Sequence, residues 1–112
     1  MKNIEIQTIT INNKAYPYLL KQIYNNPKRL YVLGNVDNLN KKGVTIVGSR
    51  NCTSYGKKIA TELAYILSKK GYVIVSGLAI GIDTYAHIGA LKAGKETIAV
   101  LAHGLNQIYP KQ

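Results

Sequence analysis

The chain has 112 residues, of which 46% are hydrophobic and 18% charged, and this composition excludes a wholly disordered chain and leaves little room for a second domain. Fifteen Lys and Arg residues against five Asp and Glu residues give a net charge of +10, so anionic partners are favoured and an enzyme with several catalytic carboxylates is disfavoured. The single cysteine, Cys52, cannot form an internal disulfide, and no Cys or His group has metal-ligand spacing, so we expect no metal or other cofactor.

The sequence shows no targeting or membrane-spanning segment. The residues that follow Met1 lack the long apolar run of a signal peptide. No apolar stretch approaches the roughly 18 residues that a membrane span needs. We therefore expect a soluble protein in the reducing cytoplasm, with no membrane partner.

The positive charge is spread evenly along the chain. Residues 1–43 and 44–112 each carry a net charge of +5, and most of the basic residues are lysines, a bias that an AT-rich genome also produces. We predict that the pairs Lys41–Lys42, Lys57–Lys58 and Lys69–Lys70 are solvated surface. Charge alone therefore indicates nucleic acid only weakly.

Residues 1–43 are predicted to form a lead-in to the main domain. Pro17 suits the first turn of a short helix, because its missing amide donor is not needed there, and Asn25–Pro27 ends that helix. The apolar run Leu30–Leu33 predicts a strand that ends at Gly34, and a polar connection follows.

Residues 44–112 alternate between predicted strands and helices. The β-branched runs Val44–Val47, Tyr72–Val75 and Thr97–Leu101 predict strands, and Tyr55–Lys70 and Asp83–Lys92 predict helices. Thr53 or Ser54 can cap the first helix, and Gly71 and Gly94 fit the helix ends. The residues predicted to face inward are Ile59, Ala60, Leu63, Ala64 and Leu67 on the first helix and Ala86, Ala90 and Leu91 on the second.

This alternation predicts an α/β fold with a parallel sheet and right-handed crossovers. Ligands of such sheets bind beyond the carboxyl ends of the strands. The sequence therefore directs attention to three loops, Gly48–Tyr55, Ser76–Asp83 and Ala102–Pro110.

The first loop carries Gly48, Ser49 and Arg50. We expect Gly48 to let the backbone turn sharply and approach a ligand closely. The Arg50 guanidinium can make paired, charge-assisted bonds to phosphate oxygens, and the helix that begins near Ser54 would aim its amides at the same place. The alternative is an exposed Arg50 that pairs with a nearby carboxylate.

The second loop runs from Ser76 through Gly77, Leu78 and Ala79 to Gly81. Its two glycines, four residues apart between a strand and a helix, suit a nest of backbone amides around an anion. An equally good interpretation is a tight strand-to-helix turn with Asp83 as the helix cap. The glycine spacing matches neither a P-loop nor a dinucleotide-binding fingerprint.

Catalytic interpretations of the sequence are weak. His87 and His103 have no partner that the sequence identifies, and a single His on a packed helix is usually structural. Cys52 has no orienting His and acid beside it, and Ser49 and Ser76 lack a base.

Taken together, the motifs resemble the DNA-processing protein A (DprA/Smf) family, over roughly residues 15–110. The resemblance rests on the order and spacing of several segments, not on one glycine motif. These segments are Tyr16-Pro17, Leu30-Tyr31, Gly34-Asn35, Thr45–Arg50, Ser54–Gly56, Val75–Asp83, Ala86-His87, Ala90-Leu91, Thr97–Leu101, Gly104-Leu105 and Tyr109-Pro110.

The resemblance implies the N-terminal part of a Rossmann-like three-layer domain, here residues 44–112, preceded by the lead-in of residues 1–43. It implies a protein without catalytic activity that binds and protects single-stranded DNA during natural transformation and helps to load the RecA recombinase. The residues that would hold DNA phosphates are Gly48, Ser49, Arg50, Ser54, Ser76, Gly77, Leu78, Ala79 and Gly81. Asp83 and His87 would brace the glycine loop.

Family members usually continue well past the Tyr-Pro position, whereas this chain ends at Gln112. This indicates a fragment or a shortened relative whose uncovered sheet edge would favour a homodimer. The alternative function is a nucleotide sensor or a phosphoribohydrolase-like protein. A hydrolase of that kind needs a catalytic Glu, and no Glu lies in a candidate loop, which argues against this alternative.

Overall fold

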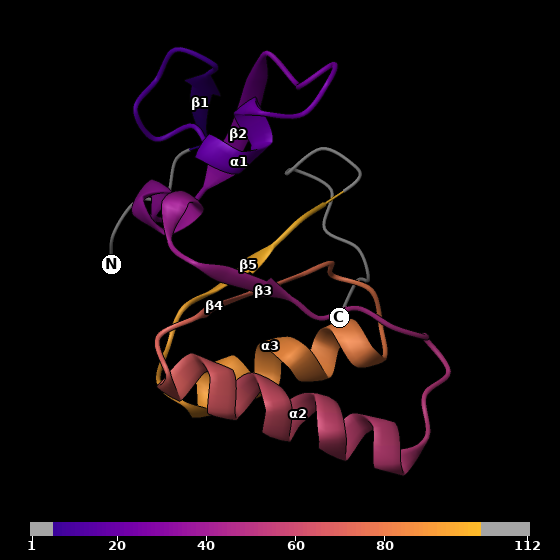
Figure 1. Cartoon of the computed structure of the whole chain (residues 1–112). Coiled ribbons are helices and arrows are strands. Elements are labelled where there is room, and N and C mark those ends of the chain that lie inside the picture. Colours follow the sequence, from indigo (N-terminus) through magenta and orange to yellow (C-terminus); the bar gives the residue numbers. More distant parts are fainter. Residues whose placement is uncertain (1–5, 102–112) are drawn as a thin grey trace. The chain divides into compact units, whose positions relative to one another are not determined.

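The computed structural model describes residues 6–101 and divides the chain into two compact units, Met1–Lys41 and Lys42–Gln112. Figure 1 shows the two units and labels their strands and α-helices. None of the helices within residues 6–101 is long and apolar enough to cross a membrane.

The first unit is built on a two-stranded antiparallel sheet of β1 (Ile6–Thr10) and β2 (Arg29–Leu33). The four-residue helix α1 (Tyr18–Lys21) follows Pro17, and the 3₁₀ helix η1 (Val36–Asn40) follows β2. Tyr16 is buried, and its hydroxyl donates a hydrogen bond to the carbonyl of Pro27, which ties the two halves of the unit together. The sequence predicted α1 and β2 but not β1 or η1.

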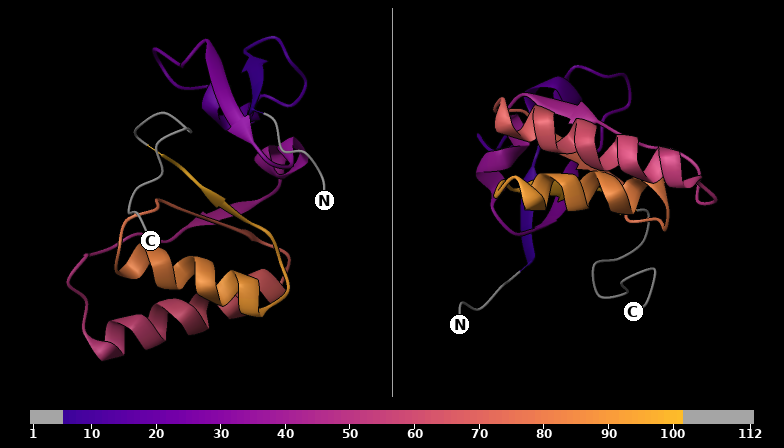
Figure 2. Two further views of the ribbon diagram at one scale, coloured as in Figure 1. Left: turned by 180° about the vertical axis from the view of Figure 1, so that it is seen from behind. Right: turned by 90° about the horizontal axis from the view of Figure 1, so that it is seen from below.

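The second unit contains a parallel sheet in the order β3 (Gly43–Thr45), β4 (Val73–Ser76), β5 (Thr97–Ala99). The connecting helices are α2 (Ser54–Lys69) and α3 (Ile82–Lys92), and both lie on the same face of the sheet (Figures 1 and 2). Two helices on one face are expected when two successive right-handed crossovers move in the same direction along the sheet. The predicted α/β class with a parallel sheet is confirmed.

The helix ends follow the predicted signals. Thr53 is the N-cap of α2, and its hydroxyl oxygen accepts a hydrogen bond from the amide of Gly56. Gly71, with a φ of +99°, and Gly94, with a φ of +74°, turn the chain after the two helices. Adding a Cβ to either glycine would meet no atom within 4 Å. At these two positions glycine is therefore needed for the backbone conformation alone.

Small side chains make up most of the core between the helices and the sheet. Ala64, Ile74, Ala86 and Ala90 are fully buried, and Ile46 and Leu67 pack against them. The prediction that Ile59, Leu63 and Leu91 face inward is wrong, because these side chains are 40%, 45% and 62% exposed.

The reason for this difference is the close packing of α2 against α3. A Cβ added at Gly89 of α3 would collide with the carbonyl oxygen of Thr61 on α2 and would lie 2.8 Å from the Cβ of Ala64. The main chains therefore approach too closely for large side chains between them. The interface takes Gly and Ala, and the larger side chains lie outside it.

Candidate phosphate-binding site

The two predicted loops meet at the carboxyl end of the parallel sheet. The Gly48–Arg50 segment follows β3, and the Gly77–Gly81 turn follows β4. The amide of Ile82 donates a hydrogen bond to the carbonyl oxygen of Ser49, with 3.2 Å between nitrogen and oxygen. Segments about thirty residues apart in sequence are thereby joined through their main chains.

Gly81 makes this approach possible. Its φ is +107°, a conformation that side-chain-bearing residues rarely adopt. A Cβ at this position would collide with the carbonyl oxygen of Ser49 and would lie 2.7 Å from the Cα of Arg50. Glycine is therefore required at position 81 both by backbone conformation and by lack of space.

Gly48 is required for a different reason from the predicted one. Its φ lies outside the positive range, so no unusual turn demands glycine there. A Cβ at position 48 would lie 2.8 Å from Cγ1 and 2.9 Å from Cβ of Ile82. What approaches Gly48 closely in the structure is Ile82, the first residue of α3, which no sequence pattern had singled out.

The polar side chains of the first loop lie on the surface. Ser49, Arg50 and Ser54 are all exposed. The Ser49 hydroxyl oxygen accepts a hydrogen bond from the amide of Asn51, at 3.1 Å, which fixes the turn that carries Arg50. Ser54 is the first residue of α2 and follows the capping residue Thr53. A guanidinium, a hydroxyl and the positive end of a helix dipole therefore belong to one short segment.

Ser76, Leu78 and Ala79 differ in what they can offer a ligand. Ser76 is 2% exposed, and its hydroxyl donates a hydrogen bond to the carbonyl of Ile46, at 2.5 Å between the oxygens. A contact from the Ser76 hydroxyl to a phosphate would require that bond to break. Leu78 and Ala79 are half-buried, and the Ala79 carbonyl accepts a hydrogen bond from the Thr84 hydroxyl.

His87 links the glycine turn to the neighbouring strand. Its Nε2 lies 2.7 Å from the carbonyl oxygen of Gly77, and because a carbonyl only accepts, Nε2 carries the hydrogen and donates it. Its Nδ1 lies 2.8 Å from the hydroxyl oxygen of Thr97, which in turn donates to the carbonyl of Ile74. These bonds give His87 the geometry of a brace for the turn.

Asp83 lies beneath the same turn. It is in the first turn of α3, but it is not the helix cap, since the N-cap residue is Gly81. Its side chain is buried, and a Cβ added at Gly77 would lie 2.6 Å from Oδ2. Its Oδ1 is buried without a hydrogen-bond partner in the structure.

Several sequence-based candidates contribute nothing further here. The third loop, Ala102–Pro110, and His103 lie outside the described residues. Cys52 is half-buried. Within residues 6–101, no group of three or more His, Cys, Asp or Glu side chains could hold a metal ion. Ile82 and Thr97, which join the two loops and hold His87, carry no chemical signature that sequence patterns could have identified.

Comparison with known proteins places the chain in a family. The family profile of the DNA recombination-mediator protein A matches residues 7–112. The chain belongs to this family. It is 45% identical over 108 residues to the DNA processing protein DprA of Bacillus subtilis and 44% identical over 104 residues to that of Streptococcus pneumoniae. The resemblance inferred from the sequence motifs is confirmed.

Two solved structures of family members share the fold. The DNA processing protein A of Streptococcus pneumoniae superposes with a TM-score of 0.88 at 43% identity, and 96% of this chain is covered. The structure from Helicobacter pylori, described by its single-stranded DNA binding mode, gives a TM-score of 0.79 at 37% identity. The chain covers 36% of the length of each of the two DprA relatives, and 38% and 46% of the two solved chains.

Proposed function

We propose that this chain binds single-stranded DNA through phosphate contacts made by the Gly48–Arg50 segment and the Gly77–Gly81 turn. The observation that carries the proposal is the main-chain bond from Ile82 to Ser49, which joins an arginine-bearing loop to a glycine turn at the ligand-binding end of a parallel sheet. The single-stranded DNA binding mode described for the Helicobacter pylori relative supports the choice of ligand.

The proposed roles follow from exposure and bonding. Arg50 supplies a charged fork for a phosphate, and Ser49 and Ser54 stand beside it on the surface. Gly77, Leu78, Ala79 and Gly81 offer main-chain groups only, as does Ser76 while its hydroxyl is engaged with the sheet. Asp83 and His87 hold the Gly77–Gly81 turn in place from the protein side and do not contact the DNA.

The decisive experiment is the fluorescence anisotropy of labelled oligothymidine with the 112-residue chain. We expect measurable affinity that falls steeply with salt, because bound phosphates release counterions. Arg50→Ala should weaken binding about tenfold on all base sequences alike, because phosphates carry no base identity. Arg29→Ala is the matched control, since it removes the same group from a strand of the first unit and should leave affinity within about twofold.

Unchanged affinity in Arg50→Ala would reject the assigned site. Saturable binding of a mononucleotide, with weak oligonucleotide binding, would favour the nucleotide-sensor alternative. Incubation with nucleoside monophosphates should yield no cleaved product, because we propose a binding protein without catalytic activity.

We also propose that the protein is located in the cytoplasm.

We further propose that the bound strand serves DNA processing in natural transformation and is passed to the RecA recombinase by an assembly of at least two copies. The family to which the chain belongs is described as a recombination mediator, which supports this role. In the described part of the second unit, β3 and β5 are edge strands of the three-stranded sheet, and such edges favour self-association. Sedimentation velocity should detect a dimer, and RecA should co-sediment with the chain and oligothymidine; a monomer that leaves RecA unbound would reject both parts.

A further inference from the structure

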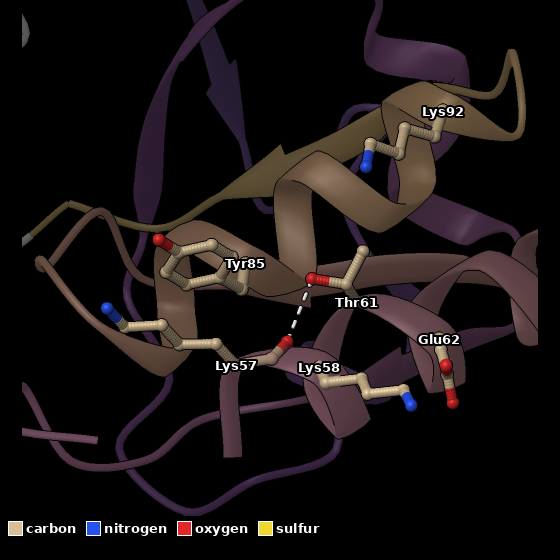
Figure 3. Close-up of a pocket in the computed structure, with 6 residues that line it drawn as sticks. All are labelled: Lys57, Lys58, Thr61, Glu62, Tyr85 and Lys92. Atoms are coloured by element: carbon tan, nitrogen blue, oxygen red, sulfur yellow. Dashed lines mark hydrogen bonds between the residues drawn. The ribbon is translucent and has the colours of Figure 1, made fainter. Parts of the chain in front are cut away.

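A basic groove lies between α2 and α3, on a surface separate from the two loops. It is a hollow of about 390 Å³, and Figure 3 shows the side chains that line it. Its lining residues are Lys57, Lys58, Thr61, Glu62, Tyr85 and Lys92. Three lysines against one glutamate give this lining a net positive charge.

The groove combines cations with an aromatic ring. The Lys57 ammonium nitrogen lies 5.5 Å from the centre of the Tyr85 ring, so charge from α2 meets an aromatic side chain from α3 (Figure 3). Lys92 reaches toward the same hollow from the other end of α3 (Figure 3). The sequence predicted that Lys57–Lys58 are simply solvated surface of one helix. That interpretation gives no reason for lysines of α2 to lie beside a tyrosine and a lysine of α3.

Helix stability does not account for the position of these lysines. Lys57 and Lys58 follow directly on the first turn of α2, a turn that contains no acidic residue. The amino-terminal end of a helix is the positive end of its dipole, so cations there are disfavoured and anions favoured. Two lysines just beyond this turn gain nothing from the dipole, and the amino-terminal end beside them favours an external anion.

Both rims of the groove begin at the two candidate loops. The amide of Lys57 donates to the carbonyl of Thr53, three residues beyond Arg50, and the amide of Tyr85 donates to the carbonyl of Gly81. Tyr85 is therefore one helical turn from Gly81, and Lys57 is one helical turn from Thr53 and seven residues from Arg50. A flexible polyanion held at the loops can reach the groove along the first turns of α2 and α3.

The hollow also continues along α2. A neighbouring hollow of about 370 Å³ shares Thr61, Glu62 and Lys92 and adds Tyr65 and Ile66 to the lining. Beside this second hollow, the Lys69 ammonium lies 5.7 Å from the centre of the Tyr65 ring. A second lysine–tyrosine pair therefore follows the first, and Lys57 and Lys69 are about 18 Å apart along α2 at 1.5 Å per residue.

The geometry points to a second contact for single-stranded DNA in this groove, in which Lys57 and Lys92 bind phosphates and Tyr85 stacks on a base. Alternation of cations and aromatic rings is how single strands are held without sequence preference. This inference rests on the proposed function, because it takes the strand bound at the loops and extends its path. An acidic peptide would use the lysines but would gain little from the ring.

The test compares oligothymidines of about 6 and about 20 nucleotides, the first near the lower end of single-strand site sizes of about 4–16 nucleotides and the second longer than that range. In the 112-residue chain, Lys57→Gln/Lys92→Gln should weaken binding of the longer strand about tenfold and leave the shorter strand within about twofold. For the longer strand, the slope of the logarithm of affinity against the logarithm of salt concentration should become shallower by about 1.4, because two phosphate contacts are removed. Lys70→Gln/Lys95→Gln removes the same charge from exposed positions outside the groove and should change affinity less than twofold.

Tyr85→Leu separates stacking from charge. It should weaken binding of the longer oligothymidine at least about fivefold, since stacking on one base contributes at least that factor. It should leave binding of poly-L-glutamate unchanged. Ultraviolet cross-linking of oligonucleotides that carry 4-thiothymidine, followed by peptide mapping, should mark the peptide that contains Tyr85.

The outcomes separate the two proposals. Equal losses in the groove and control lysine pairs would overturn the groove and leave the loop site standing. Equal losses for DNA and polyglutamate in every variant would favour an acidic protein partner and overturn it as well. Loss in the groove variants with none in Arg50→Ala would reject the loop site alone, and absence of any binding to oligothymidine would reject both.

Discussion

The two ends of the parallel sheet use glycine in opposite ways. At the amino end, Gly71 and Gly94 turn the chain in open space, where an added Cβ would touch nothing. At the carboxyl end, Gly48, Gly77 and Gly81 each face an atom that a Cβ would crowd within 3 Å. Glycine at one end serves chain reversal. At the other end it leaves room for close contacts, with the backbone of the first loop at Gly81 and with the side chains of Ile82 and Asp83 at Gly48 and Gly77.

The largest expected effect is at Gly81. Gly81→Ala forces a side chain into a positive φ and into the main chain of the first loop, which together should cost about 3 kcal/mol or more of the free energy of unfolding. Urea denaturation followed by circular dichroism would measure this loss. A loss no greater than that of Gly71→Ala would show that the contact between the loops is not needed for stability.

A double-mutant cycle tests why position 48 is glycine. Gly48→Ala should cost about 1–3 kcal/mol, because its methyl group meets the branched side chain of Ile82. In an Ile82→Gly background the same substitution should cost almost nothing, since Cβ, Cγ1 and Cγ2 of Ile82, the three obstructing atoms, are gone. Equal costs in both backgrounds, measured by denaturation, would instead indicate a conformational requirement at Gly48.

The brace beneath the turn is expected to have an intermediate effect. Thr97→Val keeps the shape of the side chain but leaves Nδ1 of His87 and the carbonyl of Ile74 without their partner, at a cost of about 1–3 kcal/mol. Thr45→Val, at an exposed strand position, is the control and should remain within about 0.5 kcal/mol. Thermal denaturation of both variants would compare them, and indistinguishable midpoints would contradict a bracing role.

The smallest effects belong to the amino end of the sheet. Gly71→Ala and Gly94→Ala should each cost about 1 kcal/mol, because only the backbone conformation is penalised and no atom obstructs the new methyl group. Neither substitution should alter affinity for oligothymidine in the anisotropy assay. A loss of binding in either variant would contradict the proposal that only the carboxyl end of the sheet takes part in binding.

The order of elements in the second unit could be predicted because its signals are local. Three β-branched runs mark the strands, and Thr53, Gly71 and Gly94 mark the helix ends within one or two residues. From that order, the parallel sheet follows, and with it the expectation that the loops after β3 and β4 lie at the same end. The pairing of β1 with β2 joins residues 19 to 27 positions apart in sequence, and no local signal predicted it.

Which side chains pack between α2 and α3 could not be predicted from the sequence. Hydrophobic periodicity assigns the largest apolar residues to the core, and so it placed Ile59 and Leu63 inward. The contact between α2 and α3 selects for small residues, which periodicity does not weigh. The role of Gly48 could not be predicted either, because it depends on Ile82, the first residue of α3, more than thirty positions later in the sequence.

The close contact between α2 and α3 at Gly89 has a consequence for how this surface can change over time. Because main chain rests on main chain there, the distance between the two helices does not depend on the lysines and tyrosine that line the groove. Those side chains can be exchanged one by one while the width of the groove stays constant. The fold thus separates the shape of this surface from its chemistry, and relatives can diverge in the second without disturbing the first.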